Sequence, residues 1–432
     1  MLGSAMACGA RSDMGGDPVA EGDASTDAKP PKKDAALDVG PDVYVPVGTK
    51  CVRGDASAPL TWKPDDAGVP LRPPLVVSSG GPVLPLPTFI PITFDGYEYR
   101  DQVEDFVASI GCTKYWHDIA SDYGVGVGVS GPPVHLSETP PTNIDDSQIG
   151  TWLRNKILQK TVPNAVQDET LYVIYYPSTT TITLQGETSC QSFGGYHNEV
   201  SLSDGRKVPY AVMPDCGSFG QLAGIDALTG TTSHELIEAV TDPEPMGNAA
   251  YQFPEPLYLA WALAGGGEVA DLCTFNDDAF FLPSDYPFYV EHSWVNHAAW
   301  LGQNPCQPTS DVYFASAPIL PDLIPYDIGL GPQNAAGVKI AVNSSTTIDV
   351  KLIAGGAFGG TISVDVFDGS QFLGQGKKLN FNISPSSGQV GDTLKLTINR
   401  TGTNQTYGME PFMLRAQSGG QSSSWWGVVG DP

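Results

Sequence analysis

The sequence predicts an α+β domain followed by a second domain that is an all-β sandwich. Residues 71–306 mix helical spacing with short β-branched runs, whereas the chain after about residue 312 consists of short alternating segments separated by turn residues. Because helical periodicity occurs only in the first part, the two parts are expected to fold differently. A length of 432 residues also favours more than one hydrophobic core.

The chain divides into segments 1–46, 47–309 and 310–432. The first is rich in Asp, Ala, Gly and Pro and nearly free of large apolar residues, so it is expected to be a disordered tether. Cys8 follows small residues, as at a bacterial lipobox, and we expect it to be acylated. Only seven residues precede it, so either the signal peptide starts upstream of Met1 or the likeness is fortuitous.

Charge and cysteine content indicate an exported protein. A net charge of −26 excludes nucleic acid and anionic membrane surfaces as partners, and contact with a membrane is expected only through a lipid anchor. Without Cys8, six dispersed cysteines remain, which indicates three disulfides among 15 connectivities. We therefore expect an extracellular or outer-membrane-anchored bacterial lipoprotein.

The secondary structure of the α+β part follows from periodicity. Residues 87–96 alternate and are β-branched, residues 99–120 and 149–160 have helical spacing, and residues 169–178 form an apolar run typical of a buried strand. In the last part, seven alternating segments predict an immunoglobulin-like sandwich of roughly 100 residues; they are 337–343, 346–355, 360–369, 379–387, 392–402, 410–420 and 425–430.

The stretch TTSHELIEAVTDPE, residues 231–244, carries the strongest chemical signal. His234 and Glu238 are four residues apart, so on a helix both side chains leave the same face and can bind one cation, with Glu235 beside them. The motif is H-E-x-x-H with its second histidine replaced by a carboxylate. Taken alone, it is also compatible with an ordinary charged helix face.

The surrounding residues favour the metal site. Asp242-Pro243 ends the predicted helix, and Glu268 and Asp271 follow in a Gly-led apolar segment. Zinc accepts imidazole and carboxylate ligands, and a catalytic site has three of them beside a water; other divalent transition metals remain open.

His197, in the strand-like run GGYHNEV, is a further candidate that could contact the metal or an oxyanion, although buried strand histidines are commonly structural. The third ligand is thus one of four residues: Glu268, Asp271, Asp242 or His197.

The runs SHELIEAVTDPE, GEVADLC and FYVEHSWVNHAAWLGQNPC resemble, in order and spacing, zincin-like secreted proteins with an H-E-x-x-E-x-x-T-D-P core, an E-I-A-D-x-C segment and a closing V-Q-x-x-W-x-N…C strand. The plant phosphate-induced (EXORDIUM-like) family carries this series. The resemblance also includes SCQSFGGYHNEV and VPYAVMPDC, so it covers roughly residues 87–306.

The resemblance implies a zincin-like metalloprotease domain over 47–309. It assigns His234, Glu238 and Glu268 to the metal and Glu235 to catalysis, with His197 as a second catalytic candidate; Asp271 and Asp242 would support the ligands from behind.

The resemblance also implies a disulfide Cys273–Cys306. A disulfide Cys190–Cys216 would close a short loop, which favours this pair. The two cysteines that remain, Cys51 and Cys112, are then expected to pair with each other. Two positions depart from the family: Gly194 replaces a Cys and Glu291 replaces a Gln, and neither is a proposed ligand.

Two functions are therefore expected. The first is a zinc peptidase in which a metal-activated water attacks a protein or peptide substrate and Glu235 takes its proton. The second is a non-catalytic surface module for binding or signalling. In either case the C-terminal domain is expected to add recognition, for example of a cell-surface polymer, and no chemistry.

Overall fold

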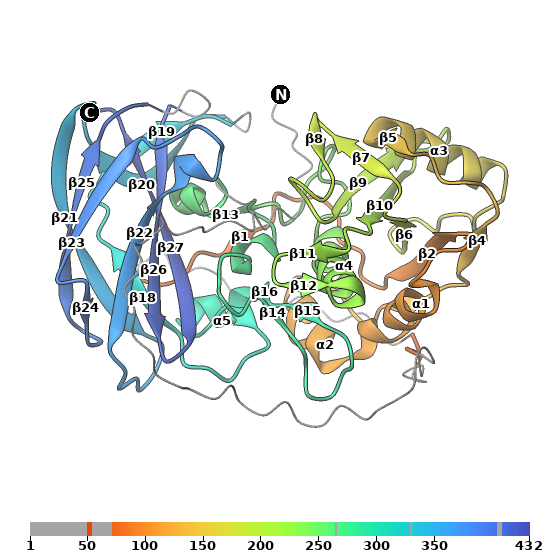
Figure 1. Ribbon diagram of the computed structural model, residues 1–432, viewed down its shortest axis with the longest axis horizontal. Coiled ribbons are helices and arrows are strands. Elements are labelled where there is room, and N and C mark those ends of the chain that lie inside the picture. The colour runs from red at the N-terminus through yellow and green to blue at the C-terminus, as the bar shows by residue number, and fades with distance from the viewer. Residues whose placement is uncertain (1–49, 54–70, 264–265, 329–330, 404–407) are drawn as a thin grey trace, which may run out of the picture.

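The computed structural model describes residues 50–53, 71–263, 266–328, 331–403 and 408–432. The expected tether 1–46 and the lipidation candidate Cys8 lie outside the described residues. Figure 1 shows two halves side by side: a sheet with helices formed by the earlier part of the chain, and the blue C-terminal sheets. Short elements of the middle of the chain lie between them.

The first half is built on a six-stranded sheet with the order β3-β2-β6-β10-β9, in which β4 also pairs with β2. Its strands are β2 (Thr88–Phe94), β3 (Val129–Ser130), β4 (Val134–Leu136), β6 (Thr170–Tyr176), β9 (Tyr196–Ser201) and β10 (Lys207–Pro214). Only β9 runs antiparallel to its neighbour, β10. Every residue of β6 is buried, as expected for a parallel strand covered on both faces.

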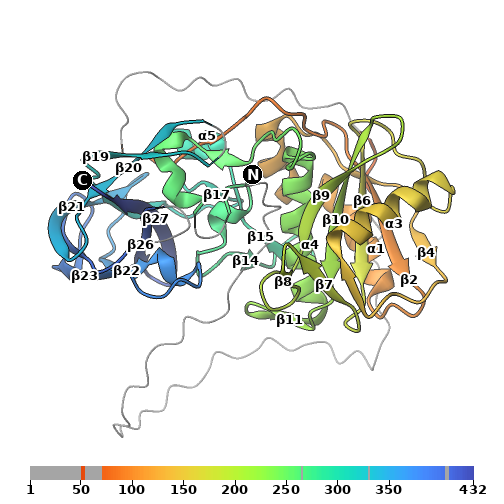
Figure 2. The same ribbon diagram turned by 90° about the horizontal axis from the view of Figure 1, so that it is seen from above.

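Helices cover both faces of this sheet (Figure 2). The helices α1 (Arg100–Ser109), α2 (Lys114–Ala120) and α4 (Gly224–Thr241) share one apolar cluster with the sheet, and α3 (Asp146–Leu158) packs in a separate cluster with the alternate strand residues. The single helix expected over 99–120 is interrupted by the 3-10 turn η1 (Ile110–Cys112), after which the Thr113 hydroxyl caps α2.

Short elements fill the rest of the first half and the region between the halves. The small strand pairs are β1 (Val76–Val77) with β13 (Phe253–Pro254), β11 (Ser218–Phe219) with β12 (Leu222–Ala223), β14 (Phe280–Phe281) with β15 (Val290–Glu291), and β16 (Ser293–Trp294) with β17 (Cys306–Gln307). A three-stranded sheet contains β5 (Asn143–Asp145), β7 (Thr181–Leu184) and β8 (Glu187–Thr188). The remaining helices are α5 (Asn296–Trp300), η2 (Ser121–Tyr123), η3 (Pro256–Trp261), η4 (Asp271–Cys273) and η5 (Gly369–Gln371).

The C-terminal half consists of a four-stranded sheet, β18-β21-β25-β23, and a six-stranded sheet, β19-β20-β27-β26-β22-β24. The strands are β18 (Phe314–Pro318), β19 (Asp322–Tyr326), β20 (Gln333–Lys339), β21 (Ser344–Ala354), β22 (Ile362–Asp368), β23 (Leu379–Ser384), β24 (Ser387–Gly388), β25 (Thr393–Arg400), β26 (Glu410–Ser418) and β27 (Gln421–Gly430). One apolar cluster joins residues of both sheets, so they pack face to face as a sandwich. Each of the seven segments predicted after residue 336 contains a strand.

The two halves share a hydrophobic junction. Trp425 and Trp426 of β27 are 3% exposed and belong to the apolar cluster of the first half. Trp425 packs edge-on against Trp261, and Trp426 against Phe275. Because both tryptophans are buried against other aromatic rings, this pair stabilises the junction between the two halves.

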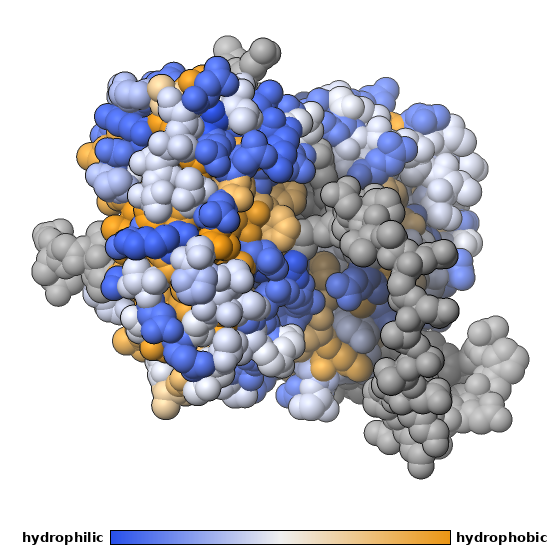
Figure 3. Space-filling view, turned by 60° about the vertical axis from the view of Figure 1, so that its left-hand side comes forward, coloured by the Kyte–Doolittle hydropathy of each residue, from blue (hydrophilic) through white to orange (hydrophobic). Residues whose placement is uncertain are grey.

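Figure 3 shows the sandwich from its outer side, where hydrophobic residues lie among hydrophilic ones on the surface.

The expected fold class, an α+β zincin-like domain, is wrong. Within the part of the chain that the structure describes there are 27 strands and five α-helices, and only α4 is longer than 13 residues. The spacing of Glu268 and Asp271 is similar to that in the second helix of zincins, and the resemblance therefore implies a helix here. The structure instead has a loop that leads into the three-residue turn η4. The Gly-rich sequence before Glu268 explains the difference, because glycine disfavours a helix that has little other support.

The three expected disulfides are confirmed: Cys51–Cys112, Cys190–Cys216 and Cys273–Cys306. Three disulfides are typical of a protein that folds in an oxidising, extracellular compartment. Among the helices that the structure describes, none has the length and apolar character needed to cross a bilayer.

Candidate metal centre

The candidate centre is organised by α4, which is buried for almost its whole length. Thr, Ser and Gly make up much of its sequence, GIDALTGTTSHELIEAVT, and these are poor helix formers. Thr231, Thr232 and Thr241 satisfy their buried hydroxyls by donating to the carbonyl four residues earlier. The helix is therefore stabilised by tertiary packing, and its polar face points into the protein interior.

Two glycines allow the surrounding segments to approach this face. At Gly195, just before β9, a Cβ would lie 2.3 Å from Met213 Cε and 3.0 Å from Glu235 Cγ. At Gly266, which has a φ of +107°, a Cβ would overlap the Asp271 carboxylate. Glycine at these two positions lets β9 and the loop before η4 close around α4.

His234 lies between three carboxylates. Its Nε2 is 3.1 Å from Glu238 Oε1 and 3.6 Å from Asp271 Oδ1, and its Nδ1 is 2.9 Å from Glu291 Oε2. Glu291 also accepts a hydrogen bond from the Thr274 hydroxyl. A carboxylate at Nδ1 keeps a proton there and leaves Nε2 as the nitrogen for a metal.

His197 occupies a parallel position on β9. Its Nδ1 is 3.4 Å from Glu235 Oε2 and 3.8 Å from Glu238 Oε2, and its Nε2 is 3.5 Å from Glu268 Oε1. Glu268 is thus placed against His197, while Asp271 and Glu238 both face the Nε2 of His234. Among the described residues, two groups of three have ligand atoms within 4.8 Å of one another, and Glu268 belongs to neither; they are His197, Glu235 and Glu238, and His234, Glu238 and Asp271.

The two later carboxylates lie at different histidines. The resemblance assigns Glu268 to the metal and Asp271 to support, and the structure places Glu268 Oε1 near Nε2 of His197 and Asp271 Oδ1 near Nε2 of His234. Glu291, which the sequence marks only as a departure from the family, accepts the hydrogen bond from Nδ1 of His234. An acidic residue in an apolar closing strand needs a partner, so the carboxylate at this position was itself an indication of such a contact.

Asp242 stabilises the end of α4. Its Oδ1 accepts a hydrogen bond from the backbone N–H of Ala250 at 2.7 Å. Burial raises the pKa of Asp242 to about 6, against which the Ala250 N–H, His197 and Glu268 act in the lowering direction. Asp242 thus links the end of α4 to the loop that follows it.

The centre is acidic, and its side chains are buried. Glu235, Glu238 and His234 are 0% exposed, and Glu268 and Asp271 are at most 2% exposed. Burial raises the pKa of all four of these carboxyls; Asp271 adds to the effect at Glu238, and Glu238 adds to it at Glu268. Without a cation, protons must neutralise part of this negative charge.

Burial and neighbouring charges shift the pKa of His197 in opposite directions. Burial by itself lowers its pKa, but the carboxylates of Glu268 and Glu235 raise the pKa well above the usual value for histidine. A proton on His197 thus partly replaces a cation between these groups. Only a group surrounded by anions behaves in this way at full burial.

The donor set fits a divalent transition metal. Several buried atoms of the cluster have no hydrogen bond of acceptable geometry; they are His197 Nε2, Glu235 Oε1, Glu238 Oε2, Asp242 Oδ2 and Glu268 Oε1. Buried polar atoms left in this state are costly unless an ion or water satisfies them. Imidazole nitrogen with carboxylate oxygen suits Zn²⁺, Mn²⁺, Fe²⁺ and Co²⁺.

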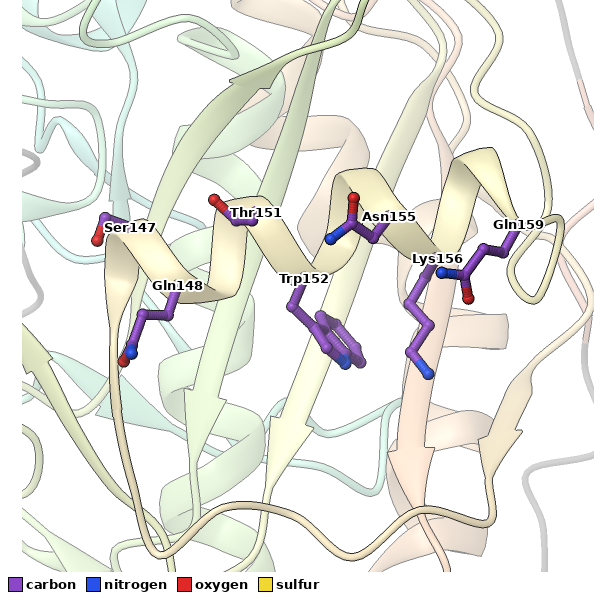
Figure 4. A pocket seen from close by; sticks show the side chains of 7 residues that line it. All are labelled: Ser147, Gln148, Thr151, Trp152, Asn155, Lys156 and Gln159. Atoms are coloured by element: carbon purple, nitrogen blue, oxygen red, sulfur yellow. The ribbon is translucent and has the colours of Figure 1, made fainter.

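The described surface also contains a hollow of about 490 Å³ along α3, formed by residues such as Trp152, Lys156 and Gln159 (Figure 4). It belongs to the α3 side of the sheet, whereas α4 packs against the opposite face. The Trp152 indole donates to Glu138, and Lys156 pairs with the same carboxylate. The polar groups of Trp152, Lys156 and Glu138 thus have one another as partners, and the sheet separates the hollow from the buried cluster.

Comparison with known proteins adds little. No known protein family matches the chain, and a search of curated proteins also finds no match. Among solved structures, the chain is similar to "Crystal structure of the S-layer protein SbsC domains 4 and 5", with 18% identity over 26% of this chain and 53% of that chain and a TM-score of 0.16. It thus spans about half the length of that structure. "Structure of surface layer protein SbsC, domains 1-6" gives 11% identity, 58% and 37% coverage, and the same TM-score. Scores this low carry no conclusion about fold or function, which must be argued from the site.

Proposed function

We propose that this chain is an exported metalloprotein that binds a divalent transition metal ion, preferably zinc, between α4 and η4. His234, Glu238 and Asp271 would hold the ion, because Nε2 of the histidine faces both carboxylates. The observation that carries the proposal is the set of unsatisfied, fully buried nitrogen and oxygen atoms around one helix face. Glu291 would keep the His234 ring in the required tautomer.

The activity that we propose is hydrolysis of an amide bond in a protein or peptide substrate. A bound divalent ion supplies Lewis-acid activation of water and of the substrate carbonyl. Glu235 Oε1 is unsatisfied and adjacent to this position along α4, so it would accept a proton from the attacking water and deliver it to the leaving nitrogen. Burial raises the pKa of Glu235, which brings this carboxyl closer to the pKa that suits a proton acceptor at neutral pH.

A second candidate is a non-catalytic module for binding or signalling, stabilised by the metal. The observation in its favour is that Glu235 is 0% exposed, so a substrate carbonyl cannot reach it in this conformation. In that case the ion would replace protons inside a structural centre. Closed zinc centres of this kind contribute directly to folding stability.

Metal analysis tests the proposal. The full chain, purified and exposed to Zn²⁺, is expected to retain at least one equivalent by mass spectrometry, and His234→Ala is expected to lose it. The control is His135→Ala, which removes an exposed histidine paired with Glu104 and should retain the metal. Protein that cannot be loaded with Zn²⁺, Co²⁺ or Mn²⁺ would contradict metal binding altogether.

The two candidates differ in the effect of Glu235→Gln. For a hydrolase, the variant should keep the ion at His234 and lose hydrolysis of a fluorogenic peptide pool by roughly 10²–10⁴-fold, the usual loss for an acid–base group. If the metal-loaded protein and the variant are equally inactive on every peptide while both retain metal, the non-catalytic candidate is correct.

Attachment to the outside of the cell is a separate proposal. We infer that Cys8 is acylated after cleavage of a signal peptide, which would leave the folded part of the chain tethered to a membrane. Incorporation of a labelled fatty acid by the wild type and its loss in Cys8→Ser would support the anchor. Labelling that persists in Cys8→Ser would contradict it.

A further inference from the structure

We propose that Glu238 bridges two cation positions and that His197 and Glu235 form the second of them. This inference rests on the proposed metal at His234 and adds a second divalent ion to it. The ligand class is a borderline transition metal dication such as Zn²⁺ or Mn²⁺, because the second position offers one imidazole nitrogen and two carboxylates.

The first argument is the placement of the two imidazoles on different oxygens of one carboxylate. His234 Nε2 is 3.1 Å from Glu238 Oε1, whereas His197 Nδ1 is 3.8 Å from Glu238 Oε2. His197 Nδ1 is also 3.4 Å from Glu235 Oε2. A carboxylate with a separate nitrogen donor at each oxygen is the arrangement of a bridging ligand, and bridged ions generally lie about 3.5–4 Å apart.

The second argument is that both rings lie between Glu238 and an outer carboxylate. The outer carboxylate is Glu291 at His234, 2.9 Å from Nδ1, and Glu268 at His197, 3.5 Å from Nε2. An outer carboxylate orients a metal-binding imidazole and keeps the proton on the far nitrogen. Glu291 already makes this hydrogen bond, and we expect Glu268 to make it when an ion occupies the second position.

The third argument is the location of the unsatisfied atoms. Glu238 Oε1 accepts backbone N–H groups from Ala270 and Asp271. The other oxygen, Glu238 Oε2, has no hydrogen-bond partner, and neither has Glu235 Oε1; both residues are fully buried. These two orphaned oxygens belong to the carboxylates that surround His197 Nδ1, which is the side of Glu238 away from the first ion.

The fourth argument is charge. Six buried carboxylates contact the two histidines or one another, and within the described chain none of them forms an ion pair with a lysine or arginine; they are Glu235, Glu238, Asp242, Glu268, Asp271 and Glu291. One dication leaves most of this charge uncompensated, whereas two dications balance four of the six. Buried charge of one sign is retained only when it is paired or coordinates metals.

Occupation of the second position changes what Glu235 can do. A carboxylate that coordinates an ion has lost the lone pair with which it would accept a proton from water. If the protein hydrolyses peptides, excess metal should therefore inhibit it by filling the position at His197. The second ion is thus a regulator of the same centre.

The test is a titration of the metal-free full chain, followed by removal of unbound ion. With Zn²⁺ we expect two equivalents per chain in the wild type and one in His197→Ala, while His135→Ala keeps two. With Mn²⁺ we expect a spectrum of two exchange-coupled ions in electron paramagnetic resonance. The spectrum needs no variant, so it remains informative if His197→Ala does not fold.

The outcomes separate this inference from the proposed function. One equivalent in the wild type, with the spectrum of an isolated Mn²⁺ ion, would overturn the second position and leave metal binding at His234 in place. No bound metal would overturn both. Two equivalents that persist in folded His197→Ala would place the second ion elsewhere and also overturn the inference.

Discussion

Two of the clusters of ionisable groups that the protein buries are compensated in opposite ways. In the C-terminal sandwich, Arg400 of β25 is 0% exposed and its Nε lies 2.6 Å from Glu410 Oε2, while its Nη1 contacts Asp431 and the carbonyl of Ile340. The cation and its anions are supplied by the same chain. Around α4, by contrast, the polar contacts of six buried carboxylates are to histidines, backbone, hydroxyl groups and one another, with no lysine or arginine among them in the described structure.

The comparison gives the physical reason for proposing that one buried cluster is structural and that the other is a metal site. A balanced ion pair is complete when the chain has folded, and nothing further needs to bind. An unbalanced cluster must take up protons or cations, because its buried like charges repel one another. Binding of a cation relieves this repulsion and so stabilises the folded state. Charge balance therefore distinguishes the two regions better than burial, which they share.

Removal of the cation from the balanced pair should have the largest effect. Arg400→Met leaves Glu410 buried without its arginine, so we expect the free energy of unfolding to fall by about 3–5 kcal/mol, measured in urea. Metal content should not change. Lys395→Met, which breaks an exposed pair with Asp349, is the control and should cost at most about 1 kcal/mol. A loss of metal in folded Arg400→Met would show that the two regions are coupled.

Metal loading should stabilise only through the unbalanced cluster. At a free Zn²⁺ concentration of 100 times Kd, binding to the folded state alone adds about 2.7 kcal/mol to the free energy of unfolding. A chelator should remove this increment from the wild type and from Lys395→Met, but the double variant His197→Ala/His234→Ala should have no increment to lose. A stabilisation by Zn²⁺ that survives in this double variant would mean that the ion binds outside the cluster.

An effect that depends on pH is expected from neutralising one carboxylate of the cluster in metal-free protein. The pKa of Asp242 is raised by burial to about 6 from an ordinary 3.8, so the folded state holds its proton after the unfolded state has released it. Stability contributed by this proton is complete below about pH 4 and is lost as the pH rises to about 6.

Asp242→Asn removes that loss and keeps an oxygen for the N–H of Ala250. In chelator we expect the variant to exceed the wild type by up to about 3 kcal/mol at pH 8 and by less than about 1 kcal/mol at pH 4, measured by urea unfolding. Asp365→Asn, on an exposed position of β22, should follow the wild type. An advantage for Asp242→Asn that is equal at both pH values would mean that packing, and not protonation, is its cause.

Much of the local structure was accessible from the sequence. Alternation located β2 and seven of the ten strands of the sandwich, and an apolar run located β6. Helical spacing located α1 and α3, and the spacing of His234 and Glu238 indicated α4. The prediction of a long helix over 99–120 missed its interruption at Ile110–Cys112, and the helix expected at Glu268 is a loop. Both errors concern segments with glycine, where local preference is weak and packing decides.

The composition of the centre could be predicted only in part. His234, Glu235 and Glu238 follow from the geometry of one helix, since residues four apart share a face whatever surrounds them. The approach of His197 depends on β9 pairing with β10, and the contact of Glu291 with His234 spans 57 residues of sequence. No periodicity encodes such distances.

What the sequence by itself determined is therefore local: the strand and helix periods, the spacing of the motif on α4, and an even set of six cysteines. What only the tertiary structure decided is which carboxylate faces which imidazole nitrogen, with Asp271 and Glu291 at His234 and Glu268 at His197. It also decided that all of these groups are buried together. The physical reason is that backbone geometry fixes neighbours along one element, whereas the contacts between elements, and the charge that they enclose, depend on how the whole chain packs.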